Sequence, residues 1–143
     1  MDKQMIERLE SSFNLLAPRA QELADRFYAT LFSRHPQVRP MFPANMSDQK
    51  QKLIASLVLV VKNLRTPEKL GEPLKEMGAR HVGYGTQPEH YPVVRDTLVD
   101  VMGEMAAEAW NPTLDKDWRA AVDVVSQIML EGHHAAVAAG ASA

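Results

Sequence analysis

The stretch KEMGARHVGYGTQPEHYP, residues 75–92, places a single histidine at the end of an apolar helical pattern, just before two glycines. Leu70, Leu74, Met77 and His81 are spaced at i, i+4, i+7 and i+11, so His81 shares the apolar face of a predicted helix. Such an imidazole is either a core histidine bonded to a backbone carbonyl or an axial ligand to a buried metal centre. A ligating imidazole must be neutral, with its second nitrogen hydrogen-bonded, and the end of a buried helix provides both conditions.

The composition limits the classes of protein to consider. The chain has 143 residues, 45% of them hydrophobic and 24% charged, which predicts one globular domain over residues 1–143. A net charge of −2 argues against nucleic acid or an anionic membrane as a partner. The absence of cysteine excludes disulfides, thiol catalysis, iron–sulfur clusters and thioether-linked haem. A charged N-terminus and a longest apolar run of LVLVV favour a cytoplasmic protein without a membrane span.

Helical periodicity recurs along the whole chain. Apolar residues at helical spacing form one stripe over residues 20–32 and another over residues 53–64. The β-branched LVLVV could pass for a strand, but residues 49–64 contain no glycine or proline, which favours a helix. With no long alternating pattern and no internal repeat, the sequence predicts an all-α domain of six or seven helices.

Breakers and capping residues predict where the other helices start. The segment HPQVRPMFP, residues 35–43, has three prolines and is expected to be a bent connection. The tail from about residue 136 is rich in small residues and is expected to fray. The predicted start signals are Ser47, Thr66-Pro67-Glu68, the capping box from Thr86 to Glu89, which opens a helix reaching about Ala109, and Asn111-Pro112.

The other histidines offer a weaker case for a bare metal ion. His35 and His90 lie at expected helix ends, and His133 and His134 belong to a single E-x-x-H motif starting at Glu131. A di-iron carboxylate bundle needs two such motifs and two further glutamates, so a solvated helix end is the simpler interpretation. One strongly placed histidine fits haem better, because the porphyrin already supplies four ligands.

A haem pocket needs an aromatic contact, apolar walls and few polar groups. Phe42 lies in the proline-rich bend, Gln49 lies one turn before Leu53 on the apolar face of its helix, and Tyr28 lies in the first stripe. Each also has an ordinary interpretation: Phe42 as a core anchor, Gln49 as an amide at a wet helix start, and Tyr28 as a structural core tyrosine.

Together these features resemble the globin family over about residues 3–138. The sequence is most similar to single-domain bacterial globins and to the haem domain of flavohaemoglobins. The resemblance rests on the order and spacing of several short pieces: Phe27-Tyr28, Leu31-Phe32, Phe42, QKQKL at 49–53, GARH at 78–81, EHYP at 89–92, and Trp118.

The resemblance implies a role for each matching position. It implies His81 as the proximal iron ligand, Phe42 as the aromatic packed on the haem, and Tyr28 with Gln49 as the distal pair that hydrogen-bonds O2. It further implies Leu53 as the apolar distal residue, Met77 on the proximal haem face, Arg80 at a propionate or in solvent, and Tyr91 as a proximal tyrosine near His81.

Two departures from flavohaemoglobins stand out. Counting from Trp118 puts Ala135 where those proteins carry a proximal glutamate, and Glu131 lies one turn earlier. A carboxylate at this position makes the ligand histidine a stronger electron donor to the iron. Without the carboxylate, we expect weaker support for oxidative chemistry at the iron. A reductase domain is not expected either, because the sequence has no G-x-G-x-x-G fingerprint.

These implications predict a non-covalent haem b protein that reversibly binds O2, CO, NO or other diatomic gases, for oxygen transport or storage. The alternative is a nitric oxide dioxygenase that works with a separate reductase. A gas sensor would need an output domain, and a helical bundle without haem would show no Soret band in its absorption spectrum.

Overall fold

The computed structural model of the protein describes residues 1–142, with side chains described for residues 1–140, and within that range it is helical with no strand. This confirms the all-α fold. The elements are α1 (Lys3–Leu16), η1 (Ala17–Arg19), α2 (Ala20–Arg34), η2 (Pro36–Met41), α3 (Ser47–Lys62), η3 (Pro67–Lys69), α4 (Gly71–Gly83), α5 (His90–Ala106), η4 (Ala107–Ala109) and α6 (Pro112–Ser142).

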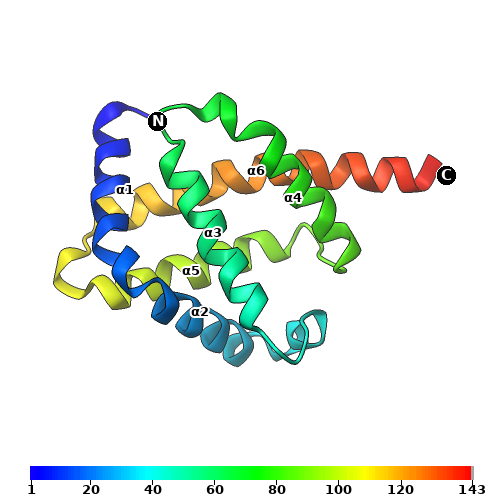
Figure 1. Ribbon diagram of the computed structural model, residues 1–143, viewed down its shortest axis with the longest axis horizontal. Coiled ribbons are helices and arrows are strands. Elements are labelled where there is room, and N and C mark those ends of the chain that lie inside the picture. The colour runs from blue at the N-terminus through cyan, green and yellow to red at the C-terminus, as the bar shows by residue number, and fades with distance from the viewer. Residues whose placement is uncertain (143) are drawn as a thin grey trace.

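Helix α6 is the long element around which the others are arranged (Figure 1). It packs against α4 most extensively and also against α5 and α1, while α5 packs against α2. Helix α3 contacts α2 and, less extensively, α1. Figure 1 shows the C-terminal end of α6 extending past its crossing with α4.

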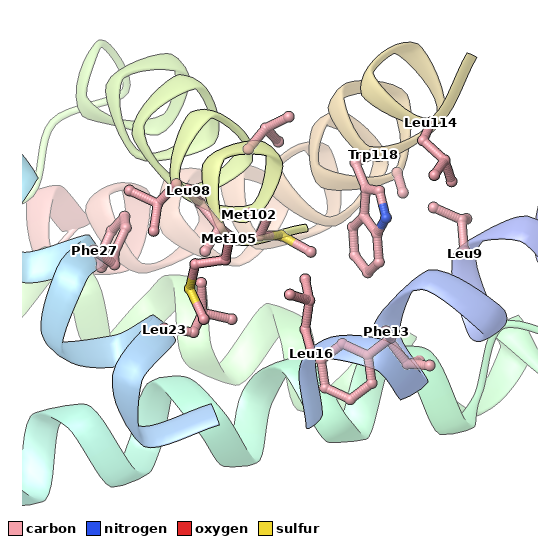
Figure 2. Close-up of a cluster of buried hydrophobic side chains, with 14 of the residues drawn as sticks. Leu9, Phe13, Leu16, Leu23, Phe27, Leu98, Met102, Met105, Leu114 and Trp118 are labelled. Carbon is pink, nitrogen blue, oxygen red and sulfur yellow. The ribbon is translucent and has the colours of Figure 1, made fainter. Parts of the chain in front are cut away.

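The main core lies where α1, α2, α5 and α6 meet (Figure 2). The Trp118 indole N–H donates to the Ser12 hydroxyl at 2.9 Å, and Arg8 pairs with the buried Asp117 at 2.6 Å, so both contacts tie α1 to α6. Burying a core of this size is the main favourable contribution to folding. The side chains labelled in Figure 2 are Leu9, Phe13, Leu16, Leu23, Phe27, Leu98, Met102, Met105, Leu114 and Trp118.

Two glycines let α4 and α6 touch at backbone distance. A Cβ atom added to Gly78 would lie 1.8 Å from the Met129 carbonyl oxygen, and one added to Gly132 would lie 1.9 Å from the Lys75 carbonyl oxygen. Only glycine fits at both positions, so the crossing point of the two helices is fixed. His81 lies one turn after Gly78, and therefore its place relative to α6 is fixed too.

Several predicted helix ends differ from the structure. Asn111 is confirmed, because its side-chain oxygen accepts the Leu114 N–H at 2.9 Å. The capping box is wrong: α5 begins only at His90, and the ring nitrogen Nδ1 of His90 accepts the Gln87 N–H at 2.9 Å. The predicted end at about Ala109 is also wrong, because Ala107 adopts a φ of 49° and ends α5 at Ala106.

Two further expectations need correction. Ser47 is the first residue of α3 and not its cap, and its N–H is accepted by Asn45 at 2.9 Å. Thr66 precedes only the short η3, and its hydroxyl donates to the Asn63 side chain, so α4 starts later, at Gly71. The tail from about residue 136 belongs to the last part of α6, which extends to Ser142, and its fraying stays a prediction.

Candidate functional site

Tyr28 on α2 and Gln49 on α3 meet, as the resemblance implies. The Gln49 side-chain amide donates to the Tyr28 hydroxyl oxygen at 3.1 Å, and only 4% of Tyr28 is exposed. Burial raises the pKa of Tyr28, an effect that the Gln49 hydrogen bond opposes in part, so the phenol stays protonated at neutral pH. Its own proton makes no hydrogen bond to any residue that the structure describes. The phenol is therefore a donor available for a ligand.

Aromatic rings hold this phenol in place. The Tyr28 ring lies 4.8 Å from Phe27 and 5.7 Å from Phe42, both edge to face. Phe42 also lies 5.2 Å from Phe32. Arg39 fixes the bend that carries Phe42, because it stacks over Phe32 at 4.9 Å and donates to the Phe42 carbonyl at 3.2 Å. The structure thus puts Phe42 beside the hydroxyl-bearing ring.

Helix α3 leaves an incompletely covered apolar surface next to this pair. Of its sixteen residues, all of them described, Val61 alone is buried. Leu53 and Leu57, one and two turns after Gln49, stay half-buried, as does Val60. Leu53 lines a recess with Phe13 that has no room for water. Half-exposed apolar side chains of this kind are the walls that a flat apolar group needs.

The protonation state of the His81 ring leaves one nitrogen, Nε2, free to bind a metal. Its Nδ1 lies 2.5 Å from the Met77 carbonyl oxygen, which can only accept, so Nδ1 carries the proton. Burial lowers the pKa of His81, electrostatic interactions with Arg80 and His133 lower it further, and the Met77 hydrogen bond acts in the opposite direction. The ring is therefore neutral at neutral pH, and Nε2 presents its lone pair. Tyr84 contacts the ring edge to face, at 5.3 Å.

Of the two residues near His81 that the resemblance assigned to the haem, Met77 is half-buried and Arg80 is exposed. Met77 is half-buried and packs against a second core cluster that includes Leu74 and Tyr91. Val60 of α3 packs against this cluster and against the main core, so α3 connects the two parts of the site. The Arg80 side chain is exposed and forms no ion pair or hydrogen bond with a described residue.

Counting from Trp118 put Ala135 at the position of the proximal glutamate, but Ala135 does not lie beside Tyr91 in the structure. Ala135 is exposed in a surface groove, and Glu131 is exposed and pairs with Lys75 at 3.7 Å. His133 is instead the residue beside Tyr91, with 4% exposure and ring centroids 6.2 Å apart. The sequence contained a signal for it: His133 continues the apolar face of Val125 and Met129, as His81 does on its own helix.

The E-x-x-H motif does not form a metal centre. Glu131 and His134 are both exposed, and residues 1–140 contain no group of three or more His, Asp or Glu side chains placed to hold an ion. The residues present do fit haem. A neutral imidazole with a free Nε2, half-exposed apolar walls on α3 and a phenol with an unused proton are the groups that a haem and its gas ligand require.

Comparisons with known proteins agree on the kind of fold. The family model described as Globin matches residues 25–129. The chain is 25% identical to a flavohemoprotein of Bacillus subtilis, over 91% of this chain and 33% of that protein, so it spans about a third of such relatives. It is 26% identical to an uncharacterized globin-like protein of Aquifex aeolicus, over 80% of this chain and 87% of the other.

A solved structure shares the fold over almost its whole length. It is an engineered carbene transferase derived from a candidate nitric oxide dioxygenase of Rhodothermus marinus, with a TM-score of 0.89 and 23% identity over 99% of both chains. No helix within residues 1–142 is both long and apolar enough to cross a membrane.

Proposed function

The chain belongs to the globin family, and from that premise we propose that it holds haem b non-covalently and reversibly binds O2 and other diatomic gases. The activity would serve oxygen transport or storage in the cytoplasm. When bound, haem supplies an iron with one open coordination position for a gas ligand. The protein's part is to hold the iron and to surround the gas with the right donors.

The observation that carries this proposal is the state of the His81 ring. The Met77 carbonyl fixes the proton on Nδ1, so Nε2 is the nitrogen available to ligate iron. Burial keeps the ring neutral, which a ligating imidazole must be. We also propose that Arg80, which is exposed in the same turn, interacts with a haem carboxylate.

On the side of the haem where the gas binds, Gln49 and Tyr28 have different roles. The amide donates to the phenol oxygen and so orients it, while the phenol keeps its own proton for the gas. Phe42 and Leu53 contribute apolar surface that excludes water. Exclusion of water slows oxidation of the iron and strengthens the hydrogen bond from the phenol to the gas.

Absorption spectra of the purified chain test this proposal. The protein loaded with haem should show a Soret band, and the ferrous form should change reversibly when O2 is added and removed. His81→Ala should lose haem or bind it weakly. The matched control is His90→Ala, at a histidine whose role here is to cap α5. A wild-type ferrous spectrum in His81→Ala, together with loss of haem in His90→Ala, would refute the assignment.

A second candidate function is nitric oxide dioxygenation. One O2, one NO and one electron give nitrate, and the electron must come from a reductase. The observation that favours it is the likeness in fold to the Rhodothermus protein, which is a candidate enzyme of this kind. Sustained nitrate formation over many turnovers with an added reductase would support it, whereas a single turnover would favour the gas-binding function.

A further inference from the structure

Two buried polar atoms near His81 lack partners. The Tyr91 hydroxyl and the Nδ1 atom of His133 are both covered, and neither forms a hydrogen bond within the described part of the chain. Their side chains are 8% and 4% exposed, respectively. The ring planes are 82° apart, with centroids separated by 6.2 Å. Unpaired buried polar groups cost free energy, so two neighbouring ones need an explanation.

The two groups are chemically complementary. Burial raises the pKa of Tyr91, so the phenol keeps its proton and can donate. A neutral imidazole that carries its proton on Nε2 presents Nδ1 as an acceptor. Each of the two groups can therefore supply the partner that the other lacks.

The crossing of α4 and α6 brings this pair to the ligand histidine. His133 directly follows Gly132, and His81 lies one turn after Gly78, the two glycines at which the backbones touch. The two histidines are close enough that protonation of both rings at once is unfavourable, which lowers the pKa of His81. Neither helix can slide without driving a carbonyl oxygen into its neighbour, so this arrangement is rigid.

We propose that His133 is a positioning residue on the His81 side of the gas site, with its Nδ1 accepting the Tyr91 hydroxyl. The pair keeps the surroundings of His81 uncharged, and this inference rests on the haem-binding function proposed above. Among the described residues, the hydrogen-bond acceptor of His81 Nδ1 is then the neutral Met77 carbonyl. A neutral acceptor leaves the imidazole a moderate electron donor, which favours reversible gas binding over oxidative chemistry.

The first experiment places a carboxylate at three neighbouring positions of the haem-loaded protein: His133→Glu, His134→Glu and Ala135→Glu. His134 and Ala135 are exposed, so they are matched controls for the same added charge. We expect His133→Glu to lower the ferric/ferrous midpoint potential and raise the Fe–His stretching frequency, with little change in either control. Equal effects in all three variants, or an effect at Ala135 alone, would overturn the proposal.

The second experiment needs neither haem nor a buried charge. In protein labelled with ¹⁵N-histidine, Tyr91→Phe should shift the His133 ring-nitrogen resonance and leave that of His134 in place. An unmoved His133 signal would overturn the pair. A wild-type chain that never acquires a Soret band would refute the proposed function instead, and this NMR result would still stand. The two failures are therefore distinguishable.

Discussion

Replacing Tyr28 with phenylalanine isolates the contribution of one hydroxyl to gas binding. Tyr28 is buried, and its ring contacts to Phe27, Phe32 and Phe42 do not involve the oxygen. Tyr28→Phe therefore keeps the volume and the aromatic contacts. It removes the phenol proton, which makes no hydrogen bond to a described residue.

The size of the effect follows from the kind of hydrogen bond that is lost. The outer atom of O2 carries partial negative charge, and a hydrogen bond to a charged group is worth about 1.5–3 kcal/mol. Since about 1.4 kcal/mol corresponds to a factor of ten, O2 release should accelerate about 10- to 100-fold. CO carries little charge on its outer atom, so its release should change much less.

Gln49→Leu separates orientation from donation. The amide donates to the phenol oxygen at 3.1 Å, so its loss should accelerate O2 release less than the loss of the phenol proton does. The two substitutions should not be additive in the double variant, because both groups act on one ligand.

Stopped-flow displacement of O2 and of CO, in wild type and in each single and double variant, measures these rates. Small and equal changes in O2 and CO release in Tyr28→Phe would refute the argument. The hydroxyl would then point away from the gas, and Tyr28 would be a structural core residue.

Other predictions concern the scaffold. Gly78→Ala forces a Cβ atom against the Met129 carbonyl and should lower the free energy of unfolding by about 1–3 kcal/mol in chemical denaturation. Gly71→Ala, at a helical glycine with open space around it, should be neutral or stabilising, and equal losses in the two variants would contradict the helix-crossing argument. The Arg119 guanidinium lowers the pKa of Asp115 below its ordinary 3.8, so this ion pair stabilises the fold above that pH and loses its contribution as pH falls through the lowered pKa. Arg119→Gln should therefore differ most from wild type in urea denaturation at pH 7, with the difference shrinking below pH 3.8; a difference that grew in acid would show that Arg119 acts otherwise.

Much of the site could be predicted from sequence because helical periodicity identifies which side chains face inward. His81, Tyr28 and Gln49 all lie on apolar faces, and the expected pairing of Tyr28 with Gln49 is present. Helix starts were predicted less well. Capping depends on local backbone geometry as well as residue type, so the pattern from Thr86 to Glu89 appeared to be a capping box although α5 begins with His90.

The sequence by itself determined the all-α fold and the place of His81 on an apolar helical face, since both follow from which residue types recur at helical spacing. Only the tertiary structure decided which residue of α6 stands beside Tyr91. One helical position corresponds to about 100° of rotation, so a count that is wrong by two residues exchanges buried His133 for exposed Ala135. The register between α4 and α6 is set where two backbones touch at Gly78 and Gly132. Such a contact arises between segments that are distant in the chain, and no local pattern of residues encodes it.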